Sequence, residues 1–189
     1  MSNWFNLDEQ LYDIKTKAPT RKDDFPLTEE ILRHSPGGDI FGMSQDIGMG
    51  WEGKRILEDQ VLILSTIGGL RQDDGTPLAL GYHTGHWELG LLVKEAAIQL
   101  KKLKCVPFAA HCSDPCDGRS QGSSAMMDSL AYRNSACEVL SRLARSLPGR
   151  KGLIGIATCD KGLPAMMMAL AENNDKRCII VMSCDVRGN

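Results

Sequence analysis

From residue 86 onward, short apolar runs alternate with longer segments whose apolar side chains recur at helical spacing. Together with an earlier apolar run, these segments predict four strands: 61–66, 106–110, 152–157 and 178–182. The intervening segments predict three helices: 89–103, 123–147 and 164–171. Strands and helices that alternate through short connections are typical of a parallel sheet with helices on both faces. We therefore expect an α/β fold.

The segment before this pattern is of a different kind. Residues 1–26 are polar and charged, and we expect them to form an irregular arm. A short helix is predicted over 26–32 with Thr28 as its N-cap, and the Gly37-Gly38-Asp39 sequence is expected to break it. The α/β domain is then expected over 27–182.

Composition excludes several classes of protein. A chain of 189 residues is long enough for one domain with a hydrophobic core. Its net charge of -2 argues against nucleic-acid or anionic-membrane partners, and no apolar run is long enough to span a bilayer. Seven cysteines without a signal peptide are more typical of buried thiols or metal ligands than of disulfides, so we expect a cytoplasmic protein.

Two loops each place a thiol beside a carboxylate. Cys116-Asp117 lies in the segment 113–122, and Cys159-Asp160-Lys161 lies in 158–164. Each loop follows a predicted strand, and ligands of parallel sheets bind outside the carboxyl ends of the strands. A soft ligand for iron next to a hard ligand for a divalent cation suggests a two-metal site.

Each of these residues also has a simpler interpretation. Asp117 before glycine is common as a turn or N-cap residue. Lys161 near a cation site would be repelled unless desolvation lowered its pKa, in which case its neutral amine could be carbamylated into an anionic ligand. Otherwise it neutralises Asp160 at the surface. His83 and His86, three residues apart near a helix start, are suited either to metal binding or to capping and packing.

In combination, these segments resemble the dihydroxy-acid and phosphogluconate dehydratase family of iron–sulfur hydro-lyases, and most closely its sugar-acid branch, the xylonate dehydratases. The resemblance covers about residues 26–172. It rests on the following segments: Pro26 to Leu32, Gly38 to Gly42, Gly48 to Trp51, Leu64 to Leu70, Ser113 to Gly122, Asp128 to Asn134, and Cys159 to Ala169.

The resemblance implies specific roles at a sheet edge of the family's N-terminal domain. Cys159 matches a ligand of an iron–sulfur cluster, either [2Fe-2S] or [4Fe-4S]. Asp117 and Asp160 match ligands of Mg²⁺, and Lys161 matches the catalytic lysine that is carbamylated and completes the metal shell. Where the commoner branch has its first cluster cysteine, this chain has His83, so either His83 or Cys116 replaces that ligand; we favour Cys116, because thiolates dominate cluster ligation.

The implied reaction is loss of water from a sugar acid, an aldonate such as D-xylonate, to give its 2-keto-3-deoxy acid. The resemblance also implies a homo-oligomer in the full-length family. Family members are several times longer, and after Ala171 the sequence departs from their pattern, with a divergent tail at 183–189. We therefore expect a fragment that is inactive alone and exposes apolar surface.

Two alternatives to a dehydratase fragment remain from the sequence. The first is a non-catalytic iron–sulfur or metal-binding interaction protein derived from the dehydratase, which would bind iron without dehydrating a sugar acid. The second is a flavodoxin-like α/β domain with incidental cysteines, which would bind no iron.

Overall fold

The computed structural model describes residues 26–72, 74–82, 84–113 and 116–182. The chain forms two compact units, 1–57 and 58–189. The described part of the first unit contains α1 (Glu29–His34), α2 (Gly37–Gly48) and the 3₁₀ helix η3 (Gly53–Leu57). Thr28 caps α1 as predicted, because its hydroxyl accepts a hydrogen bond of 3.2 Å from the Ile31 N–H. The chain does break before Gly37, but the glycines that were expected only to end a helix begin the next one.

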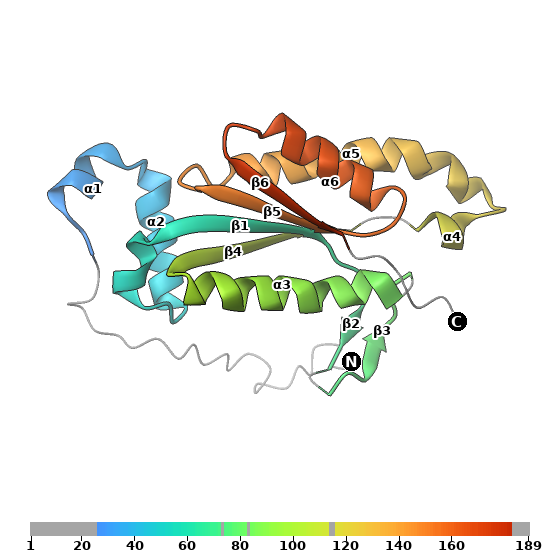
Figure 1. Cartoon of the computed structure of the whole chain (residues 1–189), viewed down its shortest axis with the longest axis horizontal. Helices are drawn as coiled ribbons and strands as arrows, with labels where there is room; N and C mark the ends of the chain where they lie inside the picture. Colours follow the sequence, from blue (N-terminus) through green and yellow to red (C-terminus); the bar gives the residue numbers. More distant parts are fainter. Residues whose placement is uncertain (1–25, 73, 83, 114–115, 183–189) are drawn as a thin grey trace, which may run out of the picture. The chain divides into compact units, whose positions relative to one another are not determined.

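The second unit is built on a four-stranded parallel sheet (Figure 1). Its strands are β1 (Asp59–Thr66), β4 (Cys105–Cys112), β5 (Gly152–Ala157) and β6 (Arg177–Met182), in the order β4-β1-β5-β6. All four predicted strands are therefore confirmed. A small antiparallel pair, β2 (Leu70–Arg71) and β3 (Pro77–Ala79), was not predicted, because two- and three-residue strands leave no alternating pattern.

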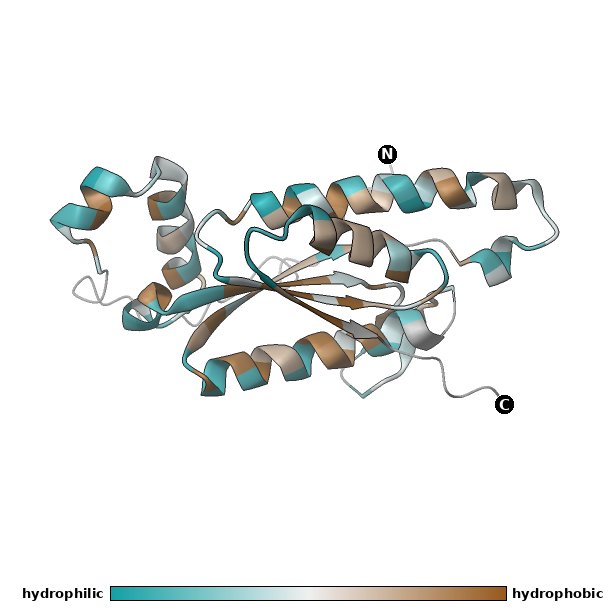
Figure 2. Cartoon of the chain, turned by 45° about the horizontal axis from the view of Figure 1, so that its top comes forward, coloured by the Kyte–Doolittle hydropathy of each residue, from teal (hydrophilic) through white to brown (hydrophobic). Residues whose placement is uncertain are grey.

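Helices cover both faces of the sheet, as predicted (Figures 1 and 2). Helices α5 (Ser129–Arg145) and α6 (Gly162–Glu172) pack on one face, where Leu62 and Leu64 point. Helix α3 (Thr84–Lys102) packs on the other face against Ile63. Successive side chains of a strand point to opposite faces, so an unbroken apolar run such as the one in β1 fills both cores.

The helix predicted over 123–147 is shorter in the structure. Its first part is the 3₁₀ helix η4 (Ser124–Asp128), which follows the separate short helix α4 (Asp117–Ser120), and the regular helix α5 starts only at Ser129. Met127 and Leu130 are apolar residues within the predicted helix, but they are 88% and 57% exposed. The 3₁₀ turn has three residues per turn, so the apolar positions around it do not continue the buried face of α5.

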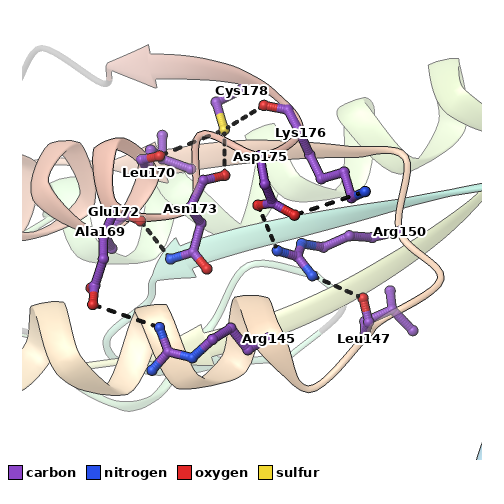
Figure 3. A network of polar contacts seen from close by, with 10 residues as sticks. All are labelled: Arg145, Leu147, Arg150, Ala169, Leu170, Glu172, Asn173, Asp175, Lys176 and Cys178. Carbon is purple, nitrogen blue, oxygen red and sulfur yellow. Dashed lines mark hydrogen bonds and ion pairs between the residues drawn. The ribbon is translucent and has the colours of Figure 1, made fainter.

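Polar contacts connect the two loops that precede β5 and β6 at the amino edge of the sheet (Figure 3). The buried Arg150 guanidinium pairs with the Asp175 carboxylate at 3.3 Å. Arg145 of α5 lies 3.7 Å from the Glu172 carboxylate at the end of α6. The Cys178 thiol faces backbone carbonyls, and burial raises its pKa. These contacts give Cys178 a packing role at the edge opposite to the two cysteine loops.

Apolar side chains are exposed on β6, which has no partner strand on its outer side among the described residues. Ile179 is 61% exposed and Ile180 is 36% exposed. This agrees with the expectation that the chain leaves apolar surface uncovered. Among the described residues, no helix is both long and apolar enough to cross a bilayer.

His111 in β4 gives the unit a predicted sensitivity to mild acid. Its Nδ1 lies 2.6 Å from the buried Ser65 hydroxyl, and partial burial of the ring lowers its pKa below 6.5. Below pH 6.5 the unfolded chain therefore takes up a proton that the folded chain does not, and stability falls as the pH falls towards the folded pKa. We expect an NMR titration of the His111 ring to have its midpoint below 6.5, and a midpoint at or above 6.5 would contradict this account.

Candidate metal-binding site

The carboxyl ends of β1, β4 and β5 lie at one edge of the sheet. Strand β1 is central, and its Ser65 is in register with His111 of β4 and Ile156 of β5. Since the three strands are parallel, the loops that follow them begin side by side. The loop after β4 leads to Cys116, and the loop after β5 holds residues 159–161. The topology thus brings the two thiol–carboxylate sequences to the same place.

A thiol pair and an imidazole meet at this edge. The Cys159 Sγ lies 3.3 Å from the His86 Nε2, and the ligand atoms of His86, Cys116 and Cys159 all lie within 4.8 Å of one another. His86 is fully buried, Cys116 is 9% exposed and Cys159 is half-buried. Sulfur and imidazole nitrogen are donors that suit iron, zinc and iron–sulfur clusters.

Backbone features hold two of these side chains in place. The Gly68 N–H donates a hydrogen bond of 3.0 Å to the His86 carbonyl, and a Cβ on Gly68 would lie only 3.0 Å from the His86 Cβ. Glycine therefore permits the close approach of the loop after β1 to the start of α3. Cys159 has a φ of +64°, in the left-handed region, which costs a non-glycine residue about 1–2 kcal/mol. Strain of this kind is concentrated at functional sites.

A lysine and two carboxylates lie beside the thiols. The Lys161 Nζ donates hydrogen bonds to the Asp117 Oδ2 at 2.5 Å and to the Asp160 Oδ2 at 2.9 Å. The side chains of Lys161 and Asp117 are 16% and 9% exposed, whereas Asp160 is 63% exposed. Asp117 comes directly after Cys116, and Asp160 directly after Cys159, so each oxygen donor is next to a sulfur donor in the chain.

The ion pair determines the direction of both pKa shifts. Hydrogen bonding to Lys161 lowers the pKa of Asp117, and the nearby Ser129 hydroxyl lowers it further. The Ser129 Oγ and the Asp117 Oδ1 do not form a hydrogen bond of ordinary geometry. Hydrogen bonds to Asp117 and then Asp160 raise the pKa of Lys161 above 10.5. The lowered pKa expected from desolvation of Lys161 is therefore wrong for this arrangement, because two carboxylate partners outweigh the effect of burial.

A cavity of about 360 Å³ opens beside Cys116. Its lining is rich in hydroxyl groups, which come from Tyr82, Ser113, Ser120, Ser123, Ser129 and Tyr132. Arg119 also lines the cavity, and its Nε donates a hydrogen bond of 2.7 Å to the Tyr82 carbonyl. Ala125 and Asp128 complete the lining, so the hydroxyls are accompanied by one guanidinium and one carboxylate, and the cavity is suited to an oxygen-rich ligand.

Most of the residues singled out from the sequence come together here. The structure brings Cys116 to Cys159, and Asp117 to Lys161, whereas His83 lies outside the described residues. From the sequence, His86 was suited either to metal binding or to capping and packing, and it was not among the favoured ligands. The available signal was the sequence spacing of two histidines three residues apart, and only the fold shows that His86 reaches Cys159.

Comparisons with known proteins agree with this description. Residues 79–186 match the sequence profile of the dihydroxy-acid/6-phosphogluconate dehydratase N-terminal region. The chain is 52% identical over 174 residues to the D-xylonate dehydratase YagF of Escherichia coli (strain K12), an alignment that covers 92% of this chain and 27% of that protein. It is 49% identical over 171 residues to the D-xylonate dehydratase YjhG of the same strain, covering 90% of this chain and 26% of that protein. It thus spans about a quarter of the length of these relatives. The chain belongs to the dihydroxy-acid/6-phosphogluconate dehydratase family.

Proposed function

We propose that this chain carries the metal-binding part of a sugar-acid dehydratase site, which removes water from an aldonate such as D-xylonate. The observation that supports this most directly is that Cys116 and Cys159 come within 4.8 Å of each other, while the carboxylates next to them in the chain, Asp117 and Asp160, share Lys161. The similarity to two D-xylonate dehydratases supports a sugar acid as the substrate class. We assign residues 27–182 to this part of the dehydratase domain.

The donor sets fit the two inorganic groups that the family implies. Cys116 and Cys159 would hold an iron–sulfur cluster, because thiolates are its usual ligands. Asp117 and Asp160 would hold Mg²⁺, which prefers carboxylate oxygens, and the buried Asp117 Oδ1 has no hydrogen-bond partner in ordinary geometry among the described residues. When bound, these groups would supply Lewis-acid polarisation of the substrate hydroxyls.

Lys161 would contribute as a ligand after carbamylation of its amine. Only the neutral amine adds carbon dioxide, with release of a proton, and hydrogen bonding to the two carboxylates keeps Lys161 charged in this arrangement. Lys161 must therefore leave these carboxylates before it can react. Asp117 and Asp160 would then face a divalent cation in place of the ammonium group, with the carbamate completing the set of oxygen ligands.

The hydroxyl-lined cavity beside Cys116 would bind the polyol part of the aldonate. Its serine and tyrosine hydroxyls can exchange hydrogen bonds with the substrate hydroxyls. Arg119 supplies positive charge for the substrate carboxylate. These side chains orient the substrate next to the thiol pair, and the proton at C2 would be removed by a base from a part of the family's domain that this chain does not match.

The test combines binding with turnover. After anaerobic reconstitution with iron and sulfide, we expect the 189-residue chain to bind D-xylonate in calorimetry only when Mg²⁺ is present, and to release no 2-keto-3-deoxy acid. Asp117→Asn should weaken this binding about 10- to 100-fold, because it removes a charged ligand. Asp59→Asn is the matched control, since Asp59 is an exposed carboxylate at the amino end of β1, at the opposite edge of the sheet.

Three other outcomes are informative. Bound iron without any affinity for the aldonate would favour the non-catalytic metal-binding protein. Absence of bound iron would favour an α/β domain with incidental cysteines. Formation of the 2-keto-3-deoxy acid would confirm the reaction and refute the expectation that the chain is inactive alone.

A further inference from the structure

We propose that Asp128 makes the cavity beside Cys116 selective for an aldonate without a phosphate group, and that it does so by charge repulsion. This selectivity rests on the proposed function and assigns a specificity-determining residue to the same site. The family name includes 6-phosphogluconate dehydratases, whereas both relatives described above are D-xylonate dehydratases. A terminal phosphate carries up to about two negative charges at neutral pH, and the terminal hydroxyl of D-xylonate carries none.

Asp128 is an exposed carboxylate in the wall of the cavity of about 360 Å³. It is the N-cap residue of α5, but its side chain forms no capping hydrogen bond. Its carboxylate has no hydrogen-bond or ion-pair partner within the part of the chain that the structure describes. The Asp128 oxygens are therefore available to accept hydrogen bonds from the hydroxyls of a ligand, and no ion pair neutralises their charge.

The cavity offers little positive charge to a second anionic group on the ligand. Arg119 is the one cation in its lining, as far as the described residues go. The Arg119 Nε already donates a hydrogen bond of 2.7 Å to the Tyr82 carbonyl, and the proposed function uses the Arg119 charge for the substrate carboxylate. Phosphate sites in proteins are built from arginine and lysine side chains or from free helix N-termini. No such cation remains here for a phosphate.

The start of α5 would attract a phosphate if Asp128 were absent. Ser129, the first residue of this helix, lines the cavity, and the partial positive charge of a helix N-terminus favours anions. Asp128 directly before it places a fixed negative charge at this point. The carboxylate thus compensates the helix end, so this wall accepts hydrogen bonds from hydroxyls and repels a further anion.

Coulomb's law gives the size of the effect. At about 6 Å and an effective dielectric constant of about 40, between the values for a protein surface and for water, one pair of like charges lowers affinity about 10-fold. Because a phosphate carries between one and two charges, we expect it to lower affinity about 10- to 100-fold.

The experiment compares D-xylonate with its ester that carries a phosphate on the terminal hydroxyl, since the two ligands differ only in that group. Calorimetry uses the 189-residue chain after anaerobic reconstitution with iron, sulfide and Mg²⁺. At low salt the wild-type chain should bind D-xylonate about 10- to 100-fold more tightly than the ester. Salt of about 1 M should reduce this ratio, because it shortens the screening length to about 3 Å.

Asp128→Asn removes the charge and keeps the shape of the side chain and one acceptor oxygen. It should strengthen binding of the phosphate ester about 10-fold or more. It should weaken binding of D-xylonate by no more than about 5-fold, the difference between a charged and a neutral hydrogen bond. Glu138→Gln is the matched control, because Glu138 is an exposed carboxylate on the same helix outside the cavity lining, and this variant should change neither affinity.

The possible outcomes separate this selectivity from the proposed function. Equal binding of both ligands by the wild-type chain, or an unchanged ratio in Asp128→Asn, overturns the role of Asp128 and leaves the dehydratase assignment standing. A chain that does not bind D-xylonate at all refutes the proposed function, and the selectivity with it. If Asp128→Asn fails to fold by circular dichroism, the wild-type ratio still decides, because a ratio that does not fall with salt overturns a role for charge.

Discussion

Replacing Leu140 with alanine is expected to lower the free energy of unfolding by about 2–5 kcal/mol, the usual range for a leucine deleted from a packed core. Leu140 is fully buried on α5, in the cluster that joins this helix to β1, β5 and α6. Its removal leaves a cavity in the layer that two helices and two strands share, and backbone elements on every side limit how far that cavity can collapse.

Urea unfolding followed by circular dichroism would measure this effect, with Leu130→Ala as the matched control. Leu130 lies on the same helix but is 57% exposed, so its loss should change the free energy by no more than about 0.5 kcal/mol. Equal losses in the two variants would mean that α5 does not pack on the sheet in the way described.

Replacing Gly155 with alanine is expected to destabilise the chain by about 1–3 kcal/mol through overpacking. Gly155 lies in the middle of β5 and faces α6. A Cβ there would lie 2.6 Å from the Met166 Cγ and 2.8 Å from the Leu170 Cδ1, and Met166 is fully buried, so either α6 or both side chains must move. Because α6 begins directly after Lys161, movement of this helix should also weaken metal binding at the edge.

Gly152→Ala on the same strand is the control for this prediction. Its Cβ would lie 3.4 Å from the Arg177 carbonyl oxygen, an ordinary contact distance, and alanine should cost little or stabilise the strand. Thermal unfolding of both variants would test the packing. A Gly155→Ala variant as stable as Gly152→Ala would contradict it.

The pattern of apolar residues was sufficient for the main elements of the fold. Buried parallel strands are continuous apolar runs, and the apolar residues of α3, α5 and α6 recur at helical spacing. The α/β fold class and its two layers of helices were therefore predictable. The central place of β1 was not, because strand order depends on how crossovers pack and not on any one strand's composition. The start of α5 was misplaced because Met127 and Leu130 are apolar but exposed, and apolar character alone does not reveal burial.

The candidate site was predictable where neighbouring residues in the sequence carry the chemistry. Cys116-Asp117 and Cys159-Asp160-Lys161 each stand out locally, and the rule for parallel sheets places both at one edge. His86 was harder to select, since it is 73 residues from Cys159 and comes next to it only through the fold. The sequence left open whether Lys161 is desolvated with a lowered pKa or neutralises Asp160. The pairing with Asp160 and with Asp117, which is 44 residues away, raises its pKa.

The left-handed backbone of Cys159 lowers the stability of the fold at the same position where metal binding needs a thiol. Glycine adopts this backbone without penalty, so a lineage that no longer used the metal could exchange the thiol for a hydrogen atom and become more stable. Retention of cysteine there is thus an evolutionary marker: among related chains, those with glycine at this turn are the ones expected to have abandoned the chemistry while keeping the fold.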